Sequence, residues 1–228
     1  MSLDAALRLT EMLFGWALIQ QSLEHLARPA PARALYGLRL LLALALVAGF
    51  QTTLASWGLL GIGVRLLRRF DGPYNGGSDR MGLLILLSLA LCHVAPTPHW
   101  QEMALGYLGV QLLLSYAMAG WVKAVNRDWW NGRALAHVFS LSIYPQSEAL
   151  RALASHRALM TGAGRAVVLF ELAFPLGLLS ARLLAVMLAL AAAFHLANAL
   201  LFGLNRFLWI WLSAFPALWW LQGRLFGG

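Results

Sequence analysis

Eight apolar segments follow one another along the chain, separated by short polar connections. We place them at about residues 6–26, 34–50, 53–69, 81–97, 103–123, 162–180, 182–202 and 206–222. Most of them approach the roughly 20 residues that a helix needs to cross a bilayer. Hydrocarbon offers the backbone no water to bond, so each segment should be helical. The pattern predicts an all-α, polytopic transmembrane helical bundle of about eight spans, folded as a single domain over residues 1–228.

Two connections are longer than a helix turn requires. The stretch "RRFDGPYNGGSDRM" (Arg68–Met81) is rich in Gly, Pro, Asn and Asp, which favour turns. Residues 126–161 hold "GRALAHVFSLSIYP" and "SEALRALASHRALM", which we expect to form short interfacial or re-entrant helices. Ser147 has the side chain of a good N-cap for the second of these helices.

Composition supports a membrane protein and gives a prediction of its orientation. The chain is 61% hydrophobic and only 11% charged, whereas a soluble domain needs about a quarter of its residues charged. Its net charge of +8 does not indicate nucleic-acid binding, because the basic residues sit at segment ends, as topology signals do. They gather after the first, third, fifth and seventh segments, so the positive-inside rule places those loops in the cytoplasm.

Other partners and processing signals are few. Cys92 is the lone cysteine, so we expect no disulfide framework, and no histidine or cysteine spacing predicts a metal site. The N-terminus lacks a basic region followed by a small-residue cleavage site, so we expect no cleaved signal peptide. The lipid bilayer is the partner that the composition predicts directly.

Ionisable residues inside the apolar segments are the first candidates for function, because charge is costly in hydrocarbon. Glu171 lies within "VVLFELAFPLGLL", and His195 lies within "AAAFHLANALL" with Asn198 three residues later on the same helical face. Two interpretations stay open: these groups line a functional pocket, or they only join helices by hydrogen bonds. Arg8 and Glu11 are three residues apart and are expected to pair with each other.

The end of the fifth segment carries the chain's most specific pattern. The stretch "YAMAGWVKAVNRDWWNGRAL" (Tyr116–Leu135) joins a span end to Lys123, Asp128 and two tryptophans. It resembles the HTTM family, the horizontally transferred transmembrane domain, which includes the membrane part of vitamin K-dependent γ-glutamyl carboxylase. The stretch "YNGGSDRMGLL" (Tyr74–Leu84) is similar to a loop of bacterial members. Weaker likenesses lie around Glu171 with Pro175 and in "FHLANALLFGLNRF" (Phe194–Phe207).

The resemblance implies a site and a cofactor. The lysine that matches Lys123 in the carboxylase is the base that deprotonates vitamin K hydroquinone, so a quinone is the implied cofactor. A lysine must be neutral to act in this way. The implied catalytic residues are Lys123, Asp128 and His137, and the implied pocket or proton-relay residues are Asp79, Glu171, His195 and Asn198.

The chain also departs from the carboxylase. Gly77 stands where the carboxylase has a histidine, and one residue must be inserted between Lys123 and Asp128 to align the two. The charge pattern places Lys123 on the cytoplasmic side, whereas the carboxylase works on the luminal side. We also expect no large extramembrane domain. These departures argue against carboxylation of glutamate in proteins.

Three functions therefore stay open for this sequence. The first is a quinone- or isoprenoid-using oxidoreductase or carboxylase-like enzyme in a bacterial inner membrane, with Lys123 as base. The second is a non-enzymatic subunit of a larger redox or pigment complex, in which Lys123 snorkels to headgroups and other membrane subunits are the partners. The third is a transporter or lipid-handling protein in which Glu171 and His195 relay protons.

Overall fold

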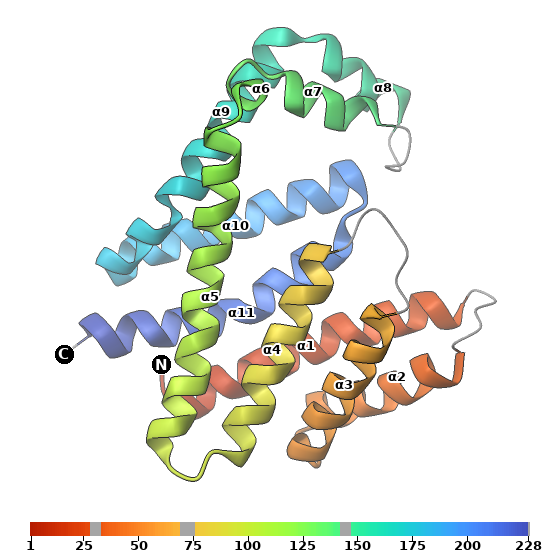
Figure 1. Cartoon of the computed structure of the whole chain (residues 1–228), viewed down its shortest axis with the longest axis vertical. Coiled ribbons are helices and arrows are strands. Elements are labelled where there is room, and N and C mark those ends of the chain that lie inside the picture. The colour runs from red at the N-terminus through yellow and green to blue at the C-terminus, as the bar shows by residue number, and fades with distance from the viewer. Residues whose placement is uncertain (28–32, 69–75, 142–146, 228) are drawn as a thin grey trace. The chain divides into compact units, whose positions relative to one another are not determined.

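The computed structural model describes residues 1–27, 33–68, 76–141 and 147–227, and these residues form helices without strands (Figure 1). The α-helices are α1 (Leu3–Leu26), α2 (Arg33–Ala48), α3 (Thr52–Leu67), α4 (Gly76–Val94), α5 (Pro98–Ala124), α6 (Arg127–Trp130), α7 (Arg133–Ser140), α8 (Glu148–Ala152), α9 (Arg157–Ala173), α10 (Ala181–Phe202) and α11 (Asn205–Phe226). Two 3₁₀ helices, η1 (Leu153–Ser155) and η2 (Phe174–Leu179), complete the described elements. The predicted all-α class is confirmed.

Helices cover most of each of the eight apolar segments, and within the described residues four helices are long and apolar enough to cross a membrane. These four cover Gly77–Val94, Pro98–Ala124, Arg157–Leu179 and Ala181–Phe202. By contrast α2 and α3 have 16 residues each, and at 1.5 Å per residue each rises only about 24 Å. An integral membrane bundle is therefore supported, and the number of eight spans stays a prediction.

Contacts divide the described chain into two compact units. Unit 1 comprises Met1–Val110 and Arg206–Gly228, and unit 2 comprises Gln111–Asn205. In unit 1, α1 packs on α2, α2 on α3, and α3 on α4. In unit 2, the short helices α6 and α7 pack on α9, and η2 packs on α10. The single domain over residues 1–228 stays a prediction.

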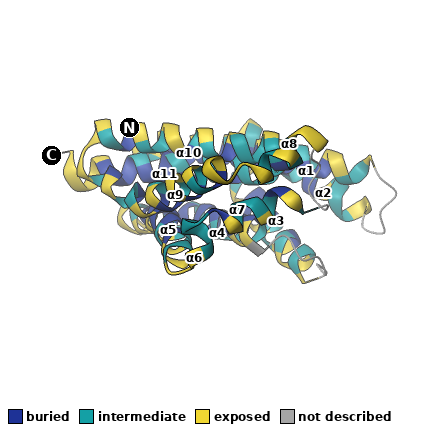
Figure 2. Ribbon diagram, turned by 90° about the horizontal axis from the view of Figure 1, so that it is seen from above, coloured by how far each residue is buried: buried dark blue, intermediate teal, exposed yellow. Residues whose placement is uncertain are grey.

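Local sequence signals explain several helix ends. Ser180 accepts a hydrogen bond from the Leu183 amide at the start of α10, and Gly203 ends that helix with a φ of +67°. Pro175 cannot donate a backbone hydrogen bond, and α9 tightens into η2 at this point. Along α10 most residues are exposed or half-buried, as expected where lipid would cover a helix (Figure 2).

The two long connections had mixed outcomes. Ser147 caps α8 by accepting a hydrogen bond from the Leu150 amide at 3.2 Å, so that prediction is confirmed. The predicted turn-rich connection Arg68–Met81 is wrong in its second half, because α4 already begins at Gly76. Its central residues, 69–75, lie outside the described part of the chain.

Candidate functional site

The last turn of α5 holds Lys123, which is the chain's single lysine among 17 basic residues. Its ammonium donates hydrogen bonds to both carboxylate oxygens of Glu171 on α9, at 2.8 Å to Oε1 and 2.6 Å to Oε2. The Glu171 side chain is 5% exposed and the Lys123 side chain 19% exposed. The structure therefore joins two of the predicted site residues in one mostly buried ion pair.

A glycine lets the two helices of this pair approach each other. Gly120 lies one turn before Lys123, and a Cβ added to it would be 2.8 Å from the Leu172 amide nitrogen and 3.0 Å from Glu171 Cβ. A contact of 2.8 Å is too short for any side chain. The glycine is thus needed for the α5–α9 contact that brings the carboxylate to the lysine.

An indole ring covers a further side of the lysine. The Lys123 ammonium lies 5.3 Å from the centre of the Trp129 ring, which is the distance of a cation–π contact. Trp129 is on α6, and Asn126 caps this short helix by accepting a hydrogen bond from the Asp128 amide. Of the neighbouring residues Asp128 and Trp129, it is therefore Trp129 that contacts Lys123.

The turn after α6 is fixed against α9. Gly132 has a φ of +79°, and a Cβ there would be 2.5 Å from the Thr161 amide nitrogen. Gly164 would meet the Trp129 carbonyl oxygen at 2.7 Å in the same way. The Thr161 hydroxyl and the Arg165 guanidinium bond backbone carbonyls of Asn131 and Trp130. Gly132, which lies within the stretch Tyr116–Leu135, therefore holds the turn that follows Trp129 against α9.

His195 takes part in a second buried pair, also in unit 2. Its Nε2 lies 2.8 Å from the Tyr116 hydroxyl, and the two residues are 4% and 3% exposed. The Tyr116 ring stacks on Phe174 at 3.9 Å, and Phe170 and Phe194 pack beside these rings. This arrangement satisfies polar groups in an apolar setting, and Lys123 is hydrogen-bonded to Glu171 rather than to this pair.

The remaining predicted residues have other contacts in unit 2 or belong to unit 1. Asp128 is half exposed and forms a surface ion pair with Arg133 at 2.6 Å, and His137 is exposed on α7. Asn198 uses its backbone carbonyl to receive the Leu204 amide at the end of α10. Asp79 belongs to unit 1 and lies near the start of α4.

Unit 1 contains a charge cluster of its own. Arg8 pairs with Glu11 at 2.8 Å, which confirms the predicted pairing, and His93 approaches the same carboxylate at 2.6 Å. No group of three His, Cys, Asp or Glu side chains among the described residues could hold a metal ion.

Within unit 2, the groups at Lys123 that a quinone would have to contact are already paired with each other. Both oxygens of Glu171 are occupied by the ammonium, and Trp129 covers another side of it. A cavity of about 510 Å³ in unit 2 lies elsewhere, lined by Asn131, Gly132, Arg133, Ala136, Ala154, Arg157 and Met160. The described residues of this unit therefore offer a proton-holding pair, and this cavity does not border it.

A model of the HTTM domain matches residues 90–220, which is more than half of the chain and includes Lys123 and Glu171. No curated protein and no solved structure gives a significant match.

Proposed function

Because this chain belongs to the HTTM domain family, we propose that it is an integral membrane enzyme that takes a proton from a membrane-soluble substrate at Lys123. Glu171 is the partner that holds the proton while the amine is neutral. The ion pair between these two residues is the observation that supports the proposal.

The choice of residue at this position supports a proton-transfer role. Of the 17 basic residues, 16 are arginines, which stay charged at any pH that a protein meets. Lysine is the basic residue that can lose its proton and then accept another. The chain's lone lysine is also the residue that sits against a buried carboxylate.

The geometry allows the proton to move without separating charge. Transfer along the 2.6 Å hydrogen bond from Lys123 Nζ to Glu171 Oε2 leaves a neutral amine beside a neutral acid. No net charge is created in the apolar surroundings by that step. The neutral amine is then able to accept a proton from a substrate hydroxyl, as a general base does.

The substrate class rests on the family resemblance. We propose a quinone or another isoprenoid with an ionisable hydroxyl, because the family's known base acts on such a compound. The 510 Å³ cavity of unit 2 does not border Lys123. We also propose a bacterial inner membrane with the basic loops, and hence Lys123, at the cytoplasmic side.

The amine itself provides a test that needs no substrate. Protein in lipid nanodiscs would be acylated with isotope-coded acetic anhydride from pH 6 to 11, and the Lys123 peptide quantified by mass spectrometry against the N-terminal amine. A base passes through its neutral, reactive form and should be labelled together with the N-terminal amine, whereas an amine held permanently as ammonium should stay unlabelled. A Lys123 peptide that stays unlabelled under conditions that label the N-terminal amine would contradict the proposal.

Two variants connect that result to the ion pair. Glu171→Gln removes the proton-holding group and should change the extent to which Lys123 is labelled. Glu102→Gln is the control, because Glu102 pairs with Arg224 in unit 1, and it should leave the labelling curve unchanged.

A non-enzymatic subunit of a larger membrane complex is the second candidate. Two observations favour it: the closed Lys123–Glu171 pair, which joins α5 to α9 as a purely structural contact would, and Gly77 in place of the carboxylase histidine. Extraction from the native membrane into polymer-bounded lipid particles would test it. Particles that contain other chains beside this 25.0 kDa protein support this candidate, and particles with this chain alone contradict it.

A further inference from the structure

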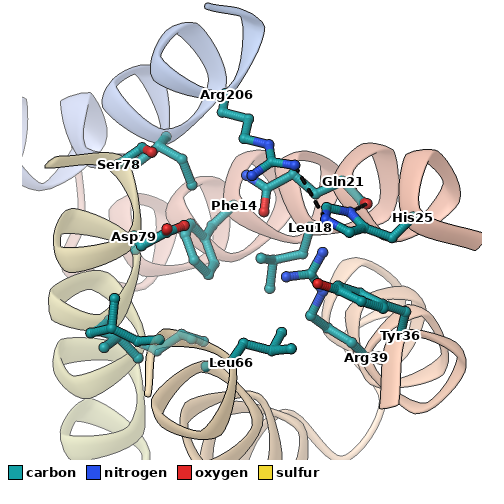
Figure 3. A pocket seen from close by; sticks show the side chains of 16 residues that line it. Phe14, Leu18, Gln21, His25, Tyr36, Arg39, Leu66, Ser78, Asp79 and Arg206 are labelled. Carbon is teal, nitrogen blue, oxygen red and sulfur yellow. Dashed lines mark hydrogen bonds between the residues drawn. The ribbon is translucent and has the colours of Figure 1, made fainter. Parts of the chain in front are cut away.

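Unit 1 contains a polar pocket at one end of its helices (Figure 3). Its volume is about 120 Å³, roughly the space of four water molecules. Polar side chains reach it from the last turns of α1, the start of α2, the start of α4 and the start of α11. These are Gln21, His25, Tyr36, Arg39, Ser78, Asp79 and Arg206. The floor is apolar and includes Phe14, Leu18 and Leu66.

Arg39 is the residue that makes this pocket unusual. It is only 8% exposed, and its guanidinium lies 4.9 Å from the centre of the Tyr36 ring. Its Nε donates a hydrogen bond to the Ser22 hydroxyl at 2.9 Å. Its Nη2 is buried and has no hydrogen-bond partner among the described residues. A buried guanidinium nitrogen without an acceptor is costly, so the pocket lacks an acceptor that Arg39 requires.

Further positive charge and one acid complete the pocket. Arg206 reaches in from α11, with its Nη2 3.4 Å from His25 Nε2 and 3.9 Å from Glu24 at the edge. Asp79 faces the pocket from α4, and among the described residues it forms no ion pair with either arginine. The N-terminal ends of α2, α4 and α11 also point their partial positive charge toward this end of the unit.

We propose that this pocket binds the phosphate group of an anionic ligand. Arg39 Nη2 and the Arg206 guanidinium donate to two phosphate oxygens, in the forked geometry that arginine offers to phosphate. Asp79 accepts a hydrogen bond from a hydroxyl or ammonium group carried by the same ligand. The volume admits one phosphate with a small substituent, so any acyl chains must lie outside the pocket.

Two sources share this chemistry: a phospholipid headgroup and free phosphate. The pocket lies at the helix ends that the charge pattern places beside the cytoplasmic headgroups, so a lipid phosphate is close at hand. The experiment separates the two sources by comparing inorganic phosphate with a lipid phosphate, and a lipid without phosphate is the control.

Delipidated protein in non-ionic detergent would be heated with increasing inorganic phosphate, dihexanoyl phosphatidic acid or dihexanoylglycerol, all at one ionic strength. A ligand that binds the native state raises the melting temperature as its concentration rises. Phosphatidic acid should raise it and dihexanoylglycerol should not. A rise with inorganic phosphate as well identifies free phosphate as a competent ligand, and a rise with phosphatidic acid alone identifies the lipid headgroup.

Variants assign the effect to this pocket. Arg206→Gln should weaken binding about tenfold or more, because a charge-assisted hydrogen bond is lost. Arg39→Lys keeps the charge, loses the fork and should also bind more weakly. Arg224→Gln is the matched control, since Arg224 is an exposed arginine of unit 1 away from the pocket, and it should bind as the wild type does.

Three outcomes overturn the proposal. The first is no rise with either phosphate-bearing probe, and the second is an equal rise with dihexanoylglycerol. The third is an Arg206→Gln variant that binds as tightly as Arg224→Gln. If Arg39→Lys fails to fold, Arg206→Gln decides alone, because the Arg206 side chain is 30% exposed and its loss leaves no buried group unpaired.

Discussion

Among the described residues, unit 2 holds the mostly buried cation Lys123 and unit 1 holds the buried cation Arg39, and the surroundings of the two differ. In unit 2 the Lys123 ammonium has both oxygens of Glu171 and the face of Trp129 around it. In unit 1 Arg39 has a serine hydroxyl and a tyrosine face, and one of its terminal nitrogens has no partner among the described residues. Groups of the chain itself satisfy the Lys123 ammonium, whereas Arg39 keeps a nitrogen that the proposed ligand would bond. A buried charge is therefore informative about ligands only after its partners have been counted.

The largest effect should come from removing one member of the satisfied pair. Lys123→Met leaves the Glu171 carboxylate buried without its partner, and we expect the free energy of unfolding to fall by about 3–5 kcal/mol. The double variant Lys123→Met/Glu171→Leu should recover most of this loss, because no charge is then left unpaired. Reversible unfolding in mixed micelles measures both. Equal losses in the single and double variants would contradict a coupled pair.

The close helix approach at Gly120 should be the next most sensitive feature. Gly120→Ala places a methyl group against the α9 backbone, and the required shift should cost about 1–3 kcal/mol. It should also loosen the ion pair and raise the labelling rate of Lys123. Gly162→Ala on α9 is the control, since a Cβ there meets nothing within 4 Å. A control as unstable as Gly120→Ala would show that the α5–α9 contact is not the cause.

A smaller effect is expected at the second polar pair of unit 2. Tyr116→Phe removes the hydroxyl that bonds His195 Nε2, and this nitrogen loses that hydrogen bond while it stays buried. We expect the free energy of unfolding to fall by about 1–2 kcal/mol. Tyr107→Phe on the exposed side of α5 should change stability by less than about 0.5 kcal/mol. Equal stability of the two variants would remove the Tyr116–His195 bond from the list of stabilising contacts.

The smallest effect should come from Arg39, which is the counterpart of Lys123 in unit 1. Arg39→Met in delipidated protein should change the free energy of unfolding by no more than about 1 kcal/mol, because an unsatisfied charge is exchanged for an apolar chain. A loss as large as that of Lys123→Met would show that the protein itself satisfies Arg39. The comparison between the two units would then fail.

Much of the fold could be predicted from hydrophobicity alone, because helix formation is obligatory for long apolar segments in a bilayer. The exception at Gly76 shows the limit of local signals. Residues such as Gly and Ser favour turns, yet here they form the first turn of α4, where Ser78 is buried. Tertiary packing decided where α4 begins, and the turn propensities of single residues carry no information about tertiary packing.

The sequence predicted the individual residues of the candidate site, but it did not predict which of them contact each other. The cost of charge in hydrocarbon singled out Glu171, and the family resemblance singled out Lys123. Lys123 and Glu171 are 48 positions apart in the sequence, and their contact depends on Gly120 and on the docking of α6. Arg39 was missed although it lies within an apolar segment, "LYGLRLLLAL". The cost of placing a charge in hydrocarbon, which selected Glu171, applies equally to Arg39 and could have identified it.

The shortness of α2 and α3 has a consequence for the bilayer itself. A rise of about 24 Å falls short of a hydrocarbon core of about 30 Å, so the surrounding lipid must thin if either helix is to span it. Thinning draws headgroups inward and exposes less acyl chain beside unit 1. We therefore expect the protein to gather lipids with shorter tails, and to be sorted toward the thinner regions of its membrane.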